Sequence, residues 1–390
     1  MTASLRLADV ARSLAAGDAS PLEVLDACLS RMGDAQAHGA FVVVDEDGAR
    51  RAAAALPRHP QGPLHGIPVA VKDLIDVAGL PTALGRSAGR VADRDAAIVA
   101  RLREAGAVIV GKTRTDELGL GALTPGASDP RDAARSPGGS SGGSAIAVAT
   151  GAAPLALATD TAGSARIPAA ACGVTGLCAA PGWMPTAGVS ILAPSFDRLG
   201  LIAAAPSDIA FAWTALGGVV GEPPERVVTL AGDARSRDAA AHLSARPVEL
   251  PGPSLAEFGA PRAVVITAEA AGLHDPRDAE SAAARAQLES GAAQSESDVR
   301  AARTRLDELG AALRDAIGPG VLVTPTLPSP PPRWDELEDT NAQLRATGRL
   351  TRLCGPVNSA GLVAVSVPSG VQVVAARMET ALGAALRLEA

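Results

Sequence analysis

The alternation of strand and helix patterns between residues 60 and 110 constrains the fold more than any other feature. Residues 67–71 form a short apolar run typical of a buried strand, and residues 108–110 form another. Between them Asp95 is the expected N-cap of a helix that ends at Gly106 and turns Ile98, Val99, Leu102 and Ala105 to one side. Strands joined through a helix pair in parallel by a right-handed crossover, so the pattern predicts an α/β fold.

The remaining segments extend this pattern over the whole chain. One helix is expected over residues 7–16, and a second begins at Ser20-Pro21, with Ser20 and Glu23 forming a capping box. A third helix, rich in alanine, is expected after residue 44 and ends at about Leu56. Residues 230–300 are rich in Ala, Arg, Asp and Glu and are expected to be helical. We see no internal repeat and favour one large domain with an insertion. Further strands are predicted at residues 39–44, 155–159, 321–325, 362–367 and 371–374.

Composition excludes several classes of function. Hydrophobic residues make up 47% of the chain and aromatic residues 2%, with no tyrosine, so Ala, Val, Leu and Ile must fill the core. The net charge of −7 comes without a basic block, which argues against a nucleic-acid partner. No apolar run is long enough for a membrane span, and residues 1–6 do not resemble a signal peptide. We therefore expect a cytoplasmic protein, and leave a homodimer open.

Cysteine and histidine give no sign of a metal site. The four cysteines form no CxxC pair, and the five histidines have no partner at metal-ligand spacing. We expect buried reduced thiols, no metal and no cofactor.

Lys72 stands at the end of an apolar strand, within Gly66-Ile67-Pro68-Val69-Ala70-Val71-Lys72-Asp73. One interpretation is a lysine whose amine reaches the surface along its aliphatic stem. The other is a buried lysine that desolvation keeps neutral, able to accept a proton.

A run of glycine and serine covers residues 136–144 and lies inside a long Gly/Pro/Ser-rich loop, residues 124–143. A loop of this length is usually functional or disordered. Core-like sequence follows at once, which argues against a flexible linker, and a phosphate loop lacks its GK[ST]. Residues 139–143 also match G-x-S-x-G, but no strand precedes them, as a nucleophile elbow requires.

A turn of small residues follows the strand at 155–159 and contains Ser164. Such a turn can aim several backbone N–H groups at one point, as an oxyanion hole requires. Asp160 and Arg166 flank it and are expected to form a charged clamp that holds it.

Together these three segments resemble the amidase-signature hydrolases. The matching stretches are residues 66–73, 138–145 and 160–169, in the same order and with the same spacing from Ser140 to Ser164. Weaker matches lie at residues 194–200, 324–326 and 370–372. The likeness is strongest over residues 60–205, nearly absent over the variable, substrate-side segment at about 225–300, and resumes over 320–390. It implies a single domain over residues 1–390, with a mixed, mostly parallel twisted sheet and helices on both faces.

The resemblance implies a Ser–cis-Ser–Lys mechanism. Ser164 would attack the carbonyl carbon of a small-molecule amide, and Ser140, after a cis peptide bond from Gly139, would relay its proton to Lys72. The backbone N–H groups of Thr161, Ala162, Gly163 and Ser164 would hold the oxyanion. Ser141, Asp160 and Arg166 would support these groups.

The sequence departs from the family pattern in ways that leave the substrate open. Ala162 replaces a usual glycine, Cys178-Ala179-Ala180-Pro181 replaces a Lys-Pro-Ser/Thr stretch, and a Gly-Leu-Pro is missing between Pro368 and Gly370. Three functions remain. The first is an amidohydrolase acting through an acyl-enzyme. The second is a partner-dependent amidotransferase-like subunit or a non-catalytic scaffold. The third is an α/β-hydrolase esterase using Ser141 with His242 or His274.

Overall fold

The main sheet passes through the whole width of the protein in the computed structural model, which describes residues 5–57, 60–243 and 247–389. Its eleven described strands follow the order β1-β5-β2-β6-β8-β7-β12-β13-β11-β9-β10, and β3 and β4 form a separate hairpin. The strands are β1 (Phe41–Val44), β2 (Pro68–Lys72), β3 (Pro81–Thr82), β4 (Arg90–Val91), β5 (Val108–Thr113), β6 (Leu155–Thr159), β7 (Thr175–Cys178), β8 (Leu199–Ala203), β9 (Val227–Thr229), β10 (Val248–Glu249), β11 (Val321–Pro325), β12 (Val363–Ser366) and β13 (Val371–Ala375).

The predicted α/β fold with a mixed sheet is confirmed, and the structure shows where the two kinds of pairing lie. Parallel pairs form two groups, β5-β2-β6 and β11-β9-β10. The strands between these groups pair antiparallel, and so does β1 with β5 at the edge, so six of the ten described pairings in the main sheet are antiparallel. The sequence pattern did not predict this antiparallel centre, because the prediction of parallel pairing came from strands joined through helices. Here β12 and β13 are joined by a hairpin, and β7 is joined to β8 without a helix.

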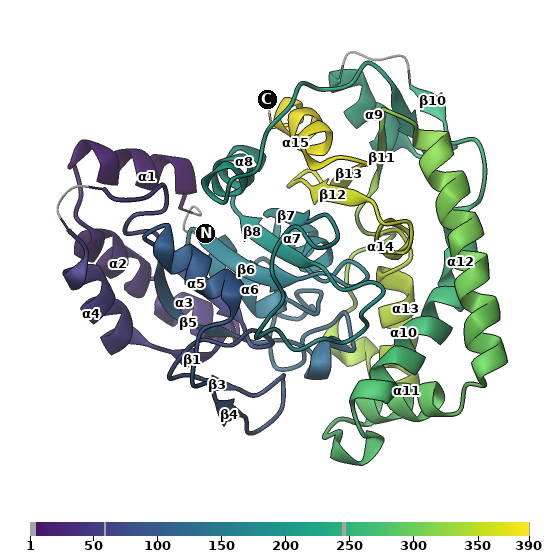
Figure 1. The fold of residues 1–390 in the computed structure, drawn as a ribbon, viewed down its shortest axis with the longest axis horizontal. Coiled ribbons are helices and arrows are strands. Elements are labelled where there is room, and N and C mark those ends of the chain that lie inside the picture. Colours follow the sequence, from purple (N-terminus) through teal and green to yellow (C-terminus); the bar gives the residue numbers. More distant parts are fainter. Residues whose placement is uncertain (1–4, 58–59, 244–246, 390) are drawn as a thin grey trace.

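Helices cover both faces of the sheet (Figure 1). They are α1 (Leu7–Ala16), α2 (Pro21–Leu29), α3 (Met32–Ala37), α4 (Glu46–Ala55), α5 (Ala97–Glu104), α6 (Gly142–Ala149), α7 (Arg166–Cys172), α8 (Pro206–Ala215), α9 (Ala234–His242), α10 (Gly259–Leu273), α11 (Ala282–Ala292), α12 (Glu296–Ile317), α13 (Thr340–Leu350), α14 (Gly355–Ser359) and α15 (Met378–Arg387).

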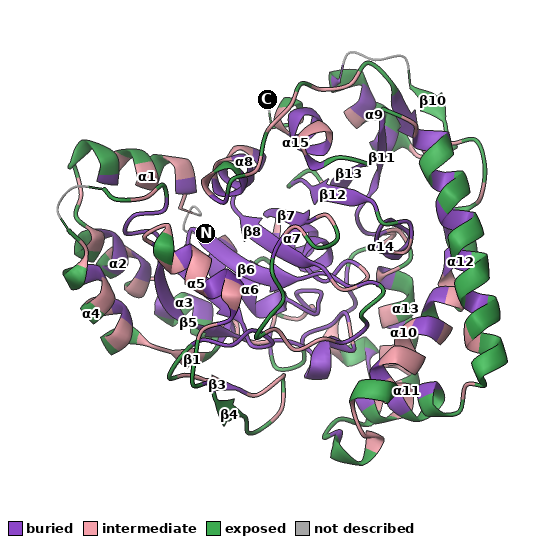
Figure 2. Cartoon of the chain, in the orientation of Figure 1, coloured by how far each residue is buried: buried purple, intermediate pink, exposed green. Residues whose placement is uncertain are grey.

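Alternate side chains of each strand enter different cores, as the pleat of a strand requires. In β2, Val69 and Val71 pack in the core beneath α1, α5, α8 and α15, whereas Ala70 packs on the opposite face with α4 and α6. In β11, Val321 and Val323 join the first core, and Leu322 packs with α10 and α12 in a third. Figure 2 shows the central strands of the main sheet buried, the short strands β4 and β10 exposed, and α12 exposed along its outer side.

Most expected elements lie where the sequence placed them, including α1, β6 and β11 at the predicted bounds. The Ser20–Glu23 capping box at α2 is confirmed. The expected cap at Asp95 is wrong. Helix α5 begins later, after Ala96, because the Asp95 carboxylate accepts hydrogen bonds from the Ala78 amide and the Arg103 side chain instead. The expectation about a signal peptide falls partly on residues 1–4, which lie outside the described residues.

Candidate active site

Lys72 ends β2 inside the protein, with a fully buried side chain. Its Nζ donates hydrogen bonds to Ser140 Oγ and to Thr159 Oγ1, each at 2.7 Å. Desolvation lowers the pKa of Lys72 to about 7, although Asp116, Asp160 and Asp197 nearby partly oppose that effect. The surface interpretation of Lys72 is therefore excluded, and its amine can be neutral near physiological pH.

Lys112 gives a useful contrast, because it is the only other lysine in the sequence and is equally buried. Its Nζ lies 2.9 Å from a carboxylate oxygen of Asp73, and it also donates to Pro81 O and Thr82 Oγ1. The two hydrogen-bond partners of Lys72, by comparison, are both neutral hydroxyl groups. An amine without a directly bonded anion is the one better suited to lose its proton.

Ser140 is presented by the Gly/Ser-rich segment that precedes α6. The peptide bond between Gly139 and Ser140 is cis, as the family resemblance implies. A Cβ atom at residue 139 would lie 2.3 Å from Asp116 Oδ2 and 2.6 Å from the Leu123 amide, so glycine is required there. The segment thus packs directly against the loop that begins at Asp116.

Ser164 lies in the turn between β6 and α7, and its side chain is nearly buried. Its carbonyl accepts a hydrogen bond from the Ser141 amide at 3.1 Å, which joins the turn to the Gly/Ser-rich segment. Within the described part of the chain, the Ser140 and Ser164 hydroxyls do not bond to each other. Lys72 and Ser140 are therefore in contact, while the expected second step of the relay is not formed in this structure.

The turn over residues 161–164 leaves several amides unengaged. In the described structure, the N–H groups of Thr161, Ala162 and Ser164 donate to no other residue. The Gly163 amide, also expected to be an oxyanion donor, instead donates to Asp160 Oδ1 at 2.8 Å. This difference arises because the Asp160 side chain folds back over its own turn, and it leaves three of the four expected donors unengaged.

Two residues of the turn show opposite steric constraints. Gly163 has a φ of 119°, and a Cβ there would lie 2.5 Å from Cys354 Cβ. Ala162, at the position where the family usually has glycine, is half-buried and is not among the residues with positive φ. Alanine therefore fits at residue 162 without strain, whereas residue 163 admits only glycine.

The expected pair of Asp160 and Arg166 forms a buried, bidentate ion pair beneath the turn. Arg166 Nη2 and Nε lie 2.9 and 3.0 Å from the two carboxylate oxygens, and neither side chain is exposed. Burial alone would raise the pKa of Asp160, but Arg166 holds it below its ordinary value. Arg166 also donates to Gln372 and Asn358, at 2.7 Å each, so the network joins the turn to β13 and α14.

Replacing Arg166 with methionine should lower the free energy of unfolding by about 3–5 kcal/mol, because it leaves the Asp160 carboxylate buried without its cation. Denaturation in urea measures the change. As a control, Arg300→Met removes an exposed pair with Glu296 on α12 and should cost less than about 1 kcal/mol. Equal losses in the two variants would contradict a structural role for the buried pair.

Sequence reasoning missed several residues that complete the site. Thr159 binds Lys72, and Asp116 accepts the Thr124 amide at 2.8 Å beneath the Gly/Ser-rich segment. Asp197 accepts the Thr161 hydroxyl at 2.7 Å. Asp197 and Gln372 lie in segments already noted for weak family likeness, which was the available signal. Thr159 and Asn358 gave none, because their contacts depend on strand order and on residues far apart in the chain.

The structure argues against the esterase interpretation. Ser141 is fully buried, and its hydroxyl donates to the Thr159 carbonyl at 3.3 Å. His274 lies at the end of α10, where its Nε2 is 3.1 Å from the Ile191 carbonyl, and His242 ends α9. Neither histidine is bonded to Ser141, so the described residues do not bring a serine–histidine pair together.

A narrow pocket adjoins these groups. It is lined by Leu74, Gly119, Thr159, Thr161, Val189 and Ser190, among others, and thus touches both the Lys72 partner Thr159 and the start of the oxyanion turn. A Cβ at residue 119 would lie 3.6 Å from Ser140 Oγ, which places the pocket beside the Ser140 hydroxyl. We call this space the inner pocket.

Comparison with known proteins is consistent with this geometry. The family model described as Amidase matches residues 23–242, more than half of the chain. The chain belongs to the amidase family. The match includes Lys72, Ser140 and Ser164, and confirms the resemblance inferred from the three motifs.

Individual relatives of this amidase-family chain carry different names. An amidase from Pseudomonas putida is 43% identical over 221 residues, which cover 55% of this chain and 47% of the relative. A glutamyl-tRNA(Gln) amidotransferase subunit from Roseiflexus castenholzii is 42% identical over 229 residues, 55% of this chain and 46% of the relative. The chain thus spans about half the length of the curated relatives it matches. A crystal structure of an amidase superposes with a TM-score of 0.86 at 30% identity, covering 98% of both chains.

The helices in the described part of this amidase-family chain include none with both the length and the apolar character needed to span a membrane.

Proposed function

We propose that this chain is an amidohydrolase that cleaves a small-molecule carboxylic amide through a Ser164 acyl-enzyme. The observation that carries the proposal is the buried Lys72 amine, which lies 2.7 Å from the Ser140 hydroxyl and whose pKa is lowered to about 7. A lysine in this state can accept a proton, and the serine beside it can pass one on. Membership of the amidase family supports the same chemistry.

In the proposed reaction, Ser164 Oγ attacks the amide carbonyl carbon while its proton passes through Ser140 to Lys72. For this step the Ser140 and Ser164 hydroxyls must move into hydrogen-bond contact, as catalytic groups often do on substrate binding. The unengaged amides of Thr161, Ala162 and Ser164 stabilise the oxyanion. The proton then returns through Ser140 to the leaving nitrogen, ammonia or an amine departs, and water hydrolyses the acyl-enzyme to the carboxylate. The reaction requires no metal or cofactor.

The supporting residues keep this geometry in place. The Asp160–Arg166 pair fixes the turn that carries Ser164, and Asp116 supports the segment that carries Ser140. We assign these as positioning residues, since the side chains of Asp160 and Asp116 hold the turn and the loop beside Gly139, and none of the three lines the inner pocket.

A partner-dependent amidotransferase component is the second candidate, favoured by the relatives that bear an amidotransferase name. The two candidates are separated by assaying the purified chain alone against simple aliphatic and aromatic amides, with ammonia release as the readout. We expect hydrolysis by the isolated chain, together with a mass increase on Ser164 equal to the acyl group when the reaction is quenched. Hydrolysis that requires an added partner protein would favour the amidotransferase candidate.

A further inference from the structure

A second, larger cavity opens next to the inner pocket, and its lining differs in charge. It has a volume of about 440 Å³, and we call it the outer cavity. Val189 and Ser190 line both spaces, so the two adjoin along this segment. On another side, the carbonyl of Leu84 in the outer cavity accepts the amide of Leu118, a residue of the inner pocket, at 2.8 Å. The outer cavity therefore lies beside the inner pocket, which adjoins Thr159 and Thr161 near the two serines.

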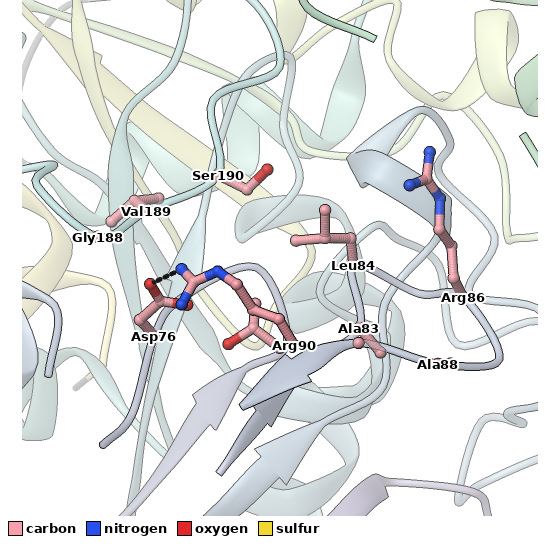
Figure 3. Close-up of a pocket in the computed structure, with 11 residues that line it drawn as sticks. Asp76, Ala83, Leu84, Arg86, Ala88, Arg90, Gly188, Val189 and Ser190 are labelled. Atoms are coloured by element: carbon pink, nitrogen blue, oxygen red, sulfur yellow. Dashed lines mark hydrogen bonds and ion pairs between the residues drawn. The ribbon is translucent and has the colours of Figure 1, made fainter. Parts of the chain in front are cut away.

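Two of the three charged side chains that line the outer cavity are arginines, in a protein whose net charge is −7. Its charged lining residues are Arg86, Arg90 and Asp76. Figure 3 shows the Arg90 guanidinium turned towards Asp76, and Arg86 on the other side of Leu84. Each arginine is paired with an acidic residue, Arg90 with Asp76 and Arg86 with Glu117, so an anionic ligand would meet their remaining N–H donors.

Both arginines keep free hydrogen-bond donors. Arg86 donates from Nε to Glu117 at 3.1 Å, and its two terminal nitrogens bond to no other described residue. Glu117 is itself engaged by the amides of Glu280 and Ser281, at 2.8 Å each. Arg90 uses one terminal nitrogen for Asp76, at 2.5 Å, and its other donors bond to no group within the described chain. Guanidinium groups with unengaged nitrogens are well suited to carboxylates.

Ala83 and Leu84 lie between the two arginines (Figure 3), and Val189 adds apolar lining elsewhere in the cavity. Apolar side chains flanked by two arginines, beside the inner pocket, match a methylene chain with a terminal carboxylate. We propose that the preferred substrates are amides whose acyl chain ends in a carboxylate, and that Arg86 and Arg90 bind this carboxylate. This inference rests on the proposed function.

The experiment compares half-amides of dicarboxylic acids with neutral amides of the same chain length. Succinamate, glutaramate, adipamate and suberamate are each paired with the corresponding alkyl amide, and kcat/KM is measured for both. We expect at least one half-amide to exceed its neutral partner by about tenfold or more, as a charge-assisted contact allows. The preference should weaken as salt rises from about 50 mM to about 0.5 M, because Arg90 is largely exposed.

Substitutions of the two arginines test whether the preference for half-amides arises in the outer cavity. Arg86→Gln and Arg90→Gln should each reduce the ratio of the two kcat/KM values several-fold, and the double variant should bring it close to one. Arg94→Gln is the matched control, because Arg94 lines the neighbouring surface cleft but not the outer cavity, and it should keep the wild-type ratio. If the wild-type protein cleaves the neutral amides with the same kcat/KM as every half-amide, the proposal is overturned.

Direct binding separates this proposal from the proposed function. Adipate and suberate, titrated into the wild-type protein and followed by calorimetry, should bind, and the double variant should bind them at least about tenfold more weakly. If no amide is hydrolysed but these dicarboxylates bind in this way, the proposed function fails and the anion site stands. If amides are hydrolysed and neither dicarboxylate binds, the anion site is refuted.

Discussion

Ser164→Ala should lower kcat/KM for amide hydrolysis by at least a thousandfold. Loss of a catalytic nucleophile commonly costs up to about 10⁶ in kcat, and the oxyanion donors sustain a small residual rate. The substitution removes one oxygen from a nearly buried side chain whose hydroxyl bonds to no other described side chain, so the fold should persist. Ammonia release gives the rate, and circular dichroism checks the fold.

The control for this variant is Ser297→Ala, which alters an exposed serine on α12 and should leave the rate unchanged. A Ser164→Ala protein that retains more than about a thousandth of the wild-type rate would show that Ser164 is not the nucleophile. The acyl mass adduct expected on wild-type protein should also be absent from this variant.

Lys72→Met should abolish activity and remove a specific part of the pH dependence of stability. In the wild-type protein, activity should rise with pH through about 7, as the buried amine loses its proton. The folded pKa of about 7 lies below the ordinary lysine value of 10.5, because burial disfavours the charged form. Between these values the unfolded chain binds a proton that the folded protein does not, so stability must increase with pH.

The size of this contribution follows from the linkage relation. From pH 7 to pH 9 the wild-type protein should gain about 2–3 kcal/mol more stability than Lys72→Met, which cannot titrate at this position. Burial raises the pKa of the four cysteine thiols, but these groups are present in both proteins and cancel in the comparison. Urea denaturation at several pH values measures the difference. Parallel stability curves for the two proteins would mean that Lys72 is protonated throughout this range.

The sequence was sufficient to predict Lys72, Ser140 and Ser164 as candidate catalytic groups because each lies in a local pattern. Lys72 ends an apolar strand, and Ser140 and Ser164 lie among small residues that permit close backbone approach. What the sequence could not supply was the order of the strands. Thr159 meets Lys72 because β6 pairs with β2, and a threonine at a strand end carries no mark of that contact.

The sequence did not predict the long-range partners of Arg166, for the same reason. Asn358 and Gln372 contact Arg166 across about two hundred residues of chain, and neither stands in a pattern that indicates a buried cation. The antiparallel centre of the sheet was also missed, since the clear strand–helix–strand signal of residues 60–110 describes only one of its parallel groups.

The presence of only two lysines, both buried, makes this protein simple to study by magnetic resonance. Because Lys72 and Lys112 are the only lysines in the sequence, incorporation of ¹³C-labelled lysine would give two side-chain signals. Their different partners, hydroxyls for Lys72 and a carboxylate for Lys112, give the two amines different chemical environments. The Cε shift of Lys72 would then report its protonation state directly, in the resting protein and with an inhibitor bound.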